Sequence, residues 1–188
     1  MRRTIVHILV LVMSACALVC AAEASDVWLD VPFVKQEKNG CGAASIAMVM
    51  QFWQRQQGIK PSADSDAPNI QFALYSLKAH GIYASDLERY FERHGYRAFA
   101  LEGRAEDLKE QLAKGRPLIV ALKPAAGAPL HYVVVAGFDP EHNLVLLNDP
   151  ADRKLLKQDL STFEKQWKGT GNWTLLAVPQ PASASSAQ

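Results

Sequence analysis

The sequence predicts an α+β domain in which helices come first and a largely antiparallel sheet follows. Three observations support this class. Apolar residues repeat at helical spacing in the first part of the domain, short β-branched apolar runs replace them from Pro117 onward, and turn residues join two of these runs as a hairpin. Helices followed by hairpin-linked strands are typical of α+β folds.

Four amphipathic helices are predicted before the strands. The third begins with a capping box at Ser85, and glycines such as Gly81, Gly95 and Gly115 end the later three. A polar segment of unusual length, residues 58–69, separates the first two helices, and it is either a lid over a site or a plain connector. The expected helical ranges are 41–55, 70–80, 85–94 and 104–114.

Four strands complete the predicted domain. Each is a short apolar run bounded by Pro, Gly, Asp or Asn. Residues 139–143 have the composition of a turn and should link the second strand to the third as a hairpin. The predicted strands are Pro117–Leu122, His131–Phe138, Leu144–Leu147 and Trp173–Val178.

Residues 1–24 are predicted to be a secretory signal peptide that is cleaved after Ala24. Arg2 and Arg3 precede an apolar stretch, and small residues follow it. Two alternatives stay open. The apolar stretch is nearly long enough to remain as a membrane anchor, and Met13-Ser14-Ala15-Cys16 resembles a lipoprotein signal. In each case we expect an exported domain, periplasmic or anchored to the membrane and facing the periplasm.

The folded domain is expected to span residues 26–178, and residues 179–188 are expected to be a disordered tail, because none of them is apolar and larger than alanine or proline. The chain has 20 basic and 19 acidic residues, so its formal net charge is +1. This balance argues against a nucleic-acid partner. We expect a monomer.

The exported domain contains a single cysteine. Of the three cysteines, Cys16 and Cys20 lie in the signal segment, which leaves Cys41 without an internal disulfide partner. Cys41 opens a predicted helix, where free N–H groups and the helix dipole favour a negative charge. We therefore predict a reactive thiol at Cys41, and its flanking glycines should let a substrate backbone approach. The alternative is a buried cysteine that only packs.

A reactive thiol needs a base, and His131 opens a predicted strand while Asp149 ends the next one. If the turn between these strands holds an odd number of residues, both side chains lie on one face of the hairpin. Opposite positions would allow a hydrogen bond that orients the imidazole. Gln36, on an extended segment five residues before Cys41, could supply an amide donor to an oxyanion. No histidine has ligand spacing with Cys41, so we expect neither metal nor cofactor.

As a set, these residues resemble the bacteriocin-processing, double-glycine-leader peptidase family, which is papain-like. The resemblance covers Val31 to about Val178 and includes Gly115-Arg116-Pro117 and the run that begins at His131. It implies a papain-like cysteine peptidase fold, a peptide or protein substrate, Cys41 as nucleophile, His131 as base, Asp149 as orienting acid and Gln36 as oxyanion donor. The chain departs from leader-processing members by its signal peptide, by Gly40 in place of an acidic residue and by a shorter gap between Gln36 and Cys41.

Two other functions use the same features. A catalytically silent module could hold peptides in the cleft, although it has no chemical need for an intact Cys41, His131 and Asp149. An acyl transferase or cell-wall amidase would use the same Cys-His-Asp chemistry on a different bond. The sequence favours an exported cysteine peptidase over both.

Overall fold

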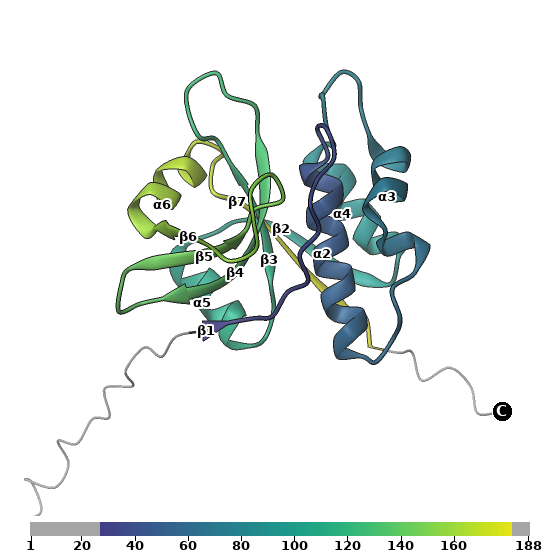
Figure 1. Ribbon diagram of the computed structural model, residues 1–188, viewed down its shortest axis with the longest axis horizontal. Coiled ribbons are helices and arrows are strands. Elements are labelled where there is room, and N and C mark those ends of the chain that lie inside the picture. The colour runs from purple at the N-terminus through teal and green to yellow at the C-terminus, as the bar shows by residue number, and fades with distance from the viewer. Residues whose placement is uncertain (1–26, 182–188) are drawn as a thin grey trace, which may run out of the picture.

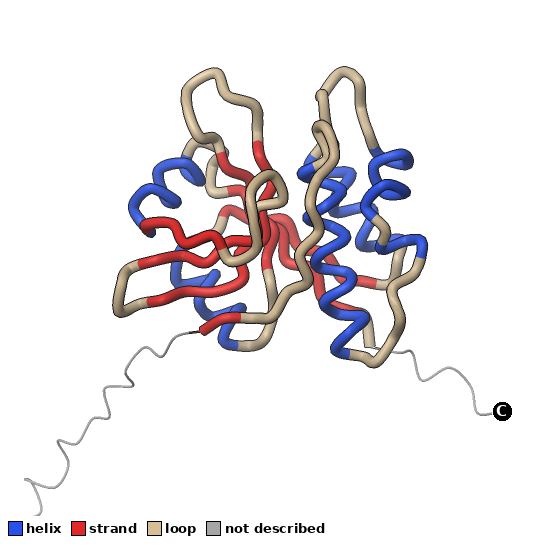
Figure 2. The backbone as a smooth tube through the Cα atoms, in the orientation of Figure 1, coloured by secondary structure: helices blue, strands red, loops and turns tan. Residues whose placement is uncertain are grey.

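The computed structural model describes residues 27–181 and confirms the predicted α+β architecture. One side of the molecule consists of α2, η1, α3 and α4, and the other of a sheet flanked by α5 and α6 (Figures 1 and 2). The helices are α2 (Cys41–Gln56), the 3₁₀ turn η1 (Ala63–Ser65), α3 (Ala67–Leu74), α4 (Ala84–Arg93), α5 (Ala105–Ala113) and α6 (Leu160–Lys168).

Seven strands form one sheet, and every pairing among the described residues is antiparallel. Their order is β2-β7-β3-β4-β5-β6, and the short β1 pairs with β4. The strands are β1 (Val27–Trp28), β2 (Tyr96–Glu102), β3 (Leu118–Leu122), β4 (His131–Asp139), β5 (Leu144–Asn148), β6 (Leu156–Asp159) and β7 (Trp173–Pro179).

Alternation along β4 divides the apolar core between the two faces of the sheet. Tyr132 and Val134 belong to a cluster that includes the buried face of α2 and α4, whereas Val133 and Val135 belong to a second cluster with α5 and α6. Because β4 is buried on both faces, its position is fixed from both sides, and so is that of His131 at its start.

Most predicted elements are present, with corrections at their ends. The second helix was predicted to reach residue 80, but α3 ends at Leu74, and Leu77 is 81% exposed. Ser76 and Gly81 instead exchange backbone hydrogen bonds of 2.8 and 3.3 Å, so the segment between them turns back as a narrow hairpin. The predicted capping box at Ser85 is also wrong, because α4 begins one residue earlier and Ser85 does not cap it.

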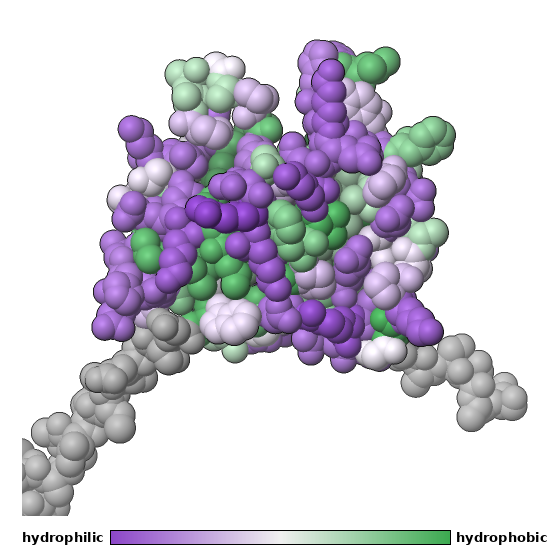
Figure 3. Space-filling view, in the orientation of Figure 1, coloured by the Kyte–Doolittle hydropathy of each residue, from purple (hydrophilic) through white to green (hydrophobic). Residues whose placement is uncertain are grey.

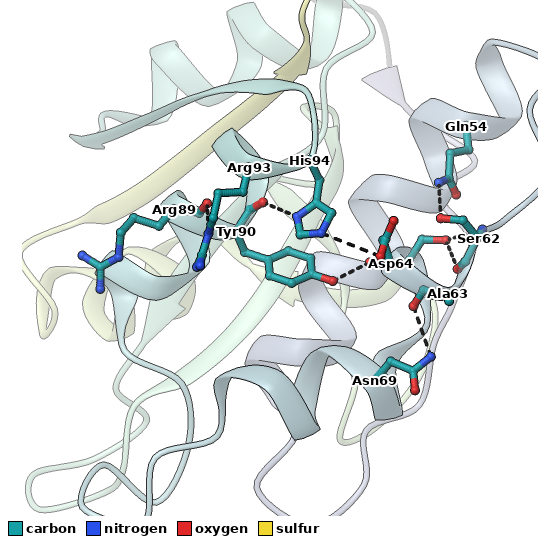
Figure 4. A network of polar contacts seen from close by, with 10 residues as sticks. Gln54, Ser62, Ala63, Asp64, Asn69, Arg89, Tyr90, Arg93 and His94 are labelled. Atoms are coloured by element: carbon teal, nitrogen blue, oxygen red, sulfur yellow. Dashed lines mark hydrogen bonds and ion pairs between the residues drawn. The ribbon is translucent and has the colours of Figure 1, made fainter.

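The polar segment 58–69, predicted as one long loop, contains η1 and the start of α3. Ser65 is fully buried, and the Gln51 amide donates to its carbonyl over 2.8 Å. The Tyr90 hydroxyl of α4 donates to the Asp64 carbonyl over 2.9 Å (Figure 4). These contacts fasten the segment to the second half of α2 and to α4, and they favour the connector over the lid.

The predicted boundary between the domain and its tail also needs correction. Strand β7 extends to Pro179, and Gln180 still donates to the Gly95 carbonyl over 2.9 Å. The signal segment and the remainder of the predicted tail, residues 182–188, lie outside the described residues. None of the helices within residues 27–181 has both the length and the apolar character needed to cross a bilayer.

Gly137 should be among the residues most sensitive to an added methyl group, because β1 pairs with β4 at this position and lies very close to it. A Cβ atom there would lie 2.5 Å from the Val27 carbonyl and 2.8 Å from Trp28 Cβ. We expect Gly137→Ala to lower the free energy of unfolding by about 1–3 kcal/mol, measured by urea denaturation. Gly81→Ala is the control, since its nearest contact would be 3.9 Å away; equal stability of both variants would contradict the prediction.

Candidate active site

The thiol of Cys41 lies at the N-terminal end of α2, as predicted. Cys41 is the first helical residue, it is partly exposed and its thiol is free. Asn39 adopts a left-handed conformation with φ of 58°, which turns the chain into the helix, and its amide donates to the Tyr75 hydroxyl over 3.3 Å. Gly40, the N-cap, provides no side-chain cap. The first turn of α2 thus keeps free backbone donors beside the sulfur.

The two glycines beside Cys41 have a packing role that the sequence did not predict, and their role in substrate approach stays a prediction. Both are buried. A side chain at position 40 would collide with the Gln71 amide, which donates to the Lys38 carbonyl over 2.9 Å. A Cβ at position 42 would lie 3.2 Å from Ile82 Cβ and 3.4 Å from the Tyr132 ring. The absence of an acidic residue before Cys41 therefore has a steric reason in this chain.

His131 and Asp149 do lie together, but through a β-bulge and not through the turn length. The turn of residues 140–143 holds an even number of residues, and its register pairs Asp139 with Leu144. Continued unchanged, that register would place His131 and Asp149 on opposite faces. The register shifts by one residue between Val135 and Gly137, so that Val134 pairs with Asn148. Asp149, the next residue after Asn148, then lies on the same face of the hairpin as His131 and is its diagonal neighbour.

The side chains of His131 and Asp149 form a hydrogen bond of 2.7 Å between Nε2 and Oδ1. Both side chains are about one-fifth exposed. The Cys41 side chain lies close enough to the imidazole to raise its pKa. Asp149 Oδ1 accepts a second bond of 2.9 Å from the Ala151 N–H, which fixes the carboxylate.

The charges of this site support one another. Burial alone would lower the pKa of His131, but its hydrogen bonds to Asp149 and Cys41 and their charges raise the pKa to about 9. Burial would raise the pKa of Asp149, but the hydrogen bond from His131 and its charge hold that pKa below its ordinary value. The imidazole is therefore positively charged at neutral pH, hydrogen-bonded to the Asp149 carboxylate and close to the Cys41 thiol.

This pair makes the stability of the domain depend on pH in a defined direction. Because the pKa of His131 is raised from 6.5 to about 9, its contribution is complete below pH 6.5 and is lost as the pH rises through 9. We expect Asp149→Asn to lower the Tm clearly at pH 6 and hardly at pH 10. In a His131→Gln background, Asp149→Asn should lower the Tm by the same amount at both pH values. If it lowered the Tm equally at pH 6 and pH 10 in the wild-type background, the charged pair of His131 and Asp149 would be contradicted.

Gln36 reaches the same region from the extended segment before α2. Its N–H donates to the carbonyl of Pro150, the residue after Asp149, over 2.9 Å. Its side chain is partly buried, and Oε1 has no hydrogen-bond partner among the described residues. The structure therefore joins Gln36 to the turn of Asp149, and it brings Cys41, His131 and Asp149 together directly.

A separate hollow of about 460 Å³ lies beside Asp64, Tyr90 and His94, between η1, α3 and α4 (Figure 4). It contains none of the four predicted site residues. The space-filling view shows instead that the molecule is hollowed along its upper edge, between two protruding loops (Figure 3). The start of α2, which carries Cys41, lies at that edge (Figure 1).

Neither the bulge nor a role for Asn148 was predicted from the sequence. Asn148 is fully buried and points away from the imidazole, toward the Val31 carbonyl. An asparagine at the end of an otherwise apolar strand is the available signal for such a role.

Comparisons with known proteins agree with this architecture. A family model described as the peptidase C39-like family matches residues 28–175. A C39-like peptidase from Bacillus anthracis is 20% identical, with a TM-score of 0.68 over 84% of this chain and 100% of that chain. No curated protein matches at a significant level.

Two further solved structures have the same fold. A double glycine motif protease from an AMS/PCAT transporter, solved with its leader peptide, is 23% identical, with a TM-score of 0.61 over 82% of this chain and 98% of that chain. Xylellain, a cysteine protease from Xylella fastidiosa, is 12% identical, with a TM-score of 0.51 over 84% and 86%. These similarities confirm the predicted papain-like peptidase fold.

Proposed function

The chain belongs to the peptidase C39-like family of cysteine peptidases, and from this premise we propose that it is an exported enzyme that hydrolyses peptide bonds through Cys41, His131 and Asp149. This membership confirms the resemblance to double-glycine-leader peptidases that the sequence shows. The observation that carries the assignment of roles is the position of the His131 imidazole, which is hydrogen-bonded to Asp149 and lies beside Cys41.

In the proposed acylation step, the Cys41 thiolate attacks the carbonyl carbon of a peptide bond. The charged imidazole of His131 stabilises negative charge on the attacking sulfur. When the tetrahedral intermediate collapses, His131 gives its proton to the leaving amine, and the acyl group stays on sulfur. Asp149 keeps the imidazole in the orientation that faces the sulfur and stabilises its charge.

In the second step, water hydrolyses the thioester. Neutral His131 now takes a proton from the attacking water, the carbon–sulfur bond breaks, and the carboxylic product leaves. The oxyanion of both steps needs donors. The N–H of Cys41 belongs to the first turn of α2, where backbone donors lack helical acceptors, and we assign the Gln36 amide as the second donor.

The proposed substrate is a peptide or an extended segment of a protein. The similar transporter protease was solved with a peptide, its leader, bound. The N-terminal sequence, with its basic start, apolar middle and small residues up to Ala24, supports an exported enzyme. When the protein is expressed with its own N-terminus, we expect it in the periplasm with the intact mass of a chain that begins at Ser25. Retention of residues 1–24 or lipidation at Cys16 would contradict this cleavage site and identify a membrane-attached form.

Peptide cleavage in ¹⁸O-labelled water tests the reaction itself. The mature enzyme and its Cys41→Ala variant are incubated with a proteome-derived peptide library, with and without an added amine. Hydrolysis predicts new C-termini that carry ¹⁸O in the wild type alone. An acyl transferase would instead join the acyl fragments to the amine, and a silent binding module would leave the library intact; either result would overturn the proposal.

A further inference from the structure

Asn148 is the last residue of β5 and directly precedes Asp149. Its side chain is completely buried and bonds in two directions. The amide nitrogen donates to the Val31 carbonyl over 3.1 Å, and the amide oxygen accepts from the Leu155 N–H over 3.0 Å. The side chain of Asn148 thus contacts backbone atoms of two different segments near the site.

The first of these segments is the turn that carries Asp149. Leu155 closes this turn with φ of 52°, a left-handed conformation that bulky residues rarely adopt. The N–H of Leu155 is held by Asn148, and within the turn the Asp149 N–H donates to the Arg153 carbonyl over 3.1 Å. Asn148 therefore closes the base of the turn and holds a strained residue in place.

The second segment is the extended chain from Val31 to Gln36. It belongs to none of the strands, so it depends on individual contacts for its position. Among these are the bond from Asn148 to Val31 at one end and the bond from the Gln36 N–H to the Pro150 carbonyl at the other. Asn148 and the turn behind it thus set where Gln36 lies relative to Asp149.

We propose that Asn148 is a positioning residue that couples the oxyanion donor Gln36 to the orienting acid Asp149. This inference rests on the proposed function. An apolar residue of similar size would fill the space but would leave the Val31 carbonyl and the Leu155 N–H unpaired in the interior. Asn148 acts through other residues and does not touch the substrate.

A double-mutant cycle distinguishes positioning from ordinary structural support. We expect Asn148→Ala to reduce kcat about tenfold with KM changed less than about twofold, because a displaced oxyanion donor acts on the transition state. In a Gln36→Ala background, the same substitution should reduce kcat clearly less than tenfold, since the donor it positions is gone and only its effect through the Asp149 turn remains. Independent, multiplying effects would overturn the inference.

Asn148→Asp is the second variant, and it replaces Asn148→Ala in the cycle if that protein does not fold. It keeps the acceptor for Leu155 and, when ionised, loses the donor to Val31. Its loss of kcat should also be clearly smaller in the Gln36→Ala background, and a loss that is undiminished there would again overturn the inference.

Ser65→Ala is the matched control. Ser65 is likewise completely buried and bonded only to backbone, since its hydroxyl donates to the Ser62 carbonyl and accepts from the Ser62 N–H. It contacts α2 at Gln51, roughly 15 Å along the helix from Cys41. In the double mutant, the fold changes in kcat caused by Ser65→Ala and by Gln36→Ala should multiply. An inactive wild type, or an active Cys41→Ala variant, would overturn the proposed function; an active wild type with a multiplicative Asn148 cycle would overturn this inference alone.

Discussion

Replacing Cys41 with alanine should reduce kcat/KM for any cleaved peptide by about 10,000-fold or more. Without the sulfur there is no group that can form the acyl intermediate, and the neighbouring residues can only bind. The measurement is the rate of appearance of a new peptide terminus at substrate concentrations well below KM.

The control for this prediction is the folded state of the variant. Cys41 is partly exposed at the end of α2, so its loss removes little apolar contact, and the Tm of the variant should stay within a few degrees of the wild type. Hydrolysis that persists in a folded Cys41→Ala protein would contradict a thiol mechanism.

Replacing His131 with alanine should be nearly as severe, with a loss of about 1,000-fold or more in kcat. No other described side chain is hydrogen-bonded to Asp149 and adjacent to Cys41, so nothing can carry the proton between sulfur, leaving group and water. Asp149→Ala should be milder by about tenfold to a hundredfold, because the thiolate and imidazolium still stabilise each other.

The order of these two effects is the informative part. Equal activity of wild type and His131→Ala would dismiss the mechanism. If Asp149→Ala reduced kcat as much as His131→Ala, the carboxylate would do more than orient the imidazole. The Tm of the Asp149→Ala variant would then show whether the carboxylate also stabilises its own turn.

The elements around the site were predictable because each follows from a local pattern. The apolar spacing after Cys41 fixes α2 as a helix, and β-branched runs give β3, β4 and β5. Cys41 and His131 could be chosen as candidate site residues because their chemistry is unusual at those places: a thiol at a helix start and a histidine at a strand start. Gln36 was found by its position before the thiol, and its role stays a prediction.

The register that joins His131 to Asp149 could not be predicted. The turn of residues 140–143 alone gives the wrong face, and the bulge between Val135 and Gly137 corrects it. The burial pattern does not reveal the bulge, because every residue there is buried whichever face it occupies. Gly137 is a local feature typical of a bulge, but a single glycine does not specify the register. It follows from the packing of α2 on one side and of α5 and α6 on the other.

The missed elements have a similar origin. Strand β2 is mostly exposed and pairs only with β7, so its sequence lacks the alternation that marks a half-buried strand. Helix α6 and strand β6 adjoin without a break between Asp159 and Leu160, which hides the change of period. In both cases a tertiary contact defines the element, and local propensity does not.

Covalent labelling with an electrophilic peptide tests the central claim most directly. The wild-type protein and its His131→Ala variant are treated at pH 7 with a peptidyl fluoromethyl ketone, and the modified residue is located by tandem mass spectrometry. The proposed site predicts stoichiometric modification of Cys41 in the folded wild type, slowed roughly tenfold or more in His131→Ala, and no labelling after unfolding in urea. Labelling of another residue, or of Cys41 at the same rate in both proteins, would contradict the claim that Cys41 and His131 act together.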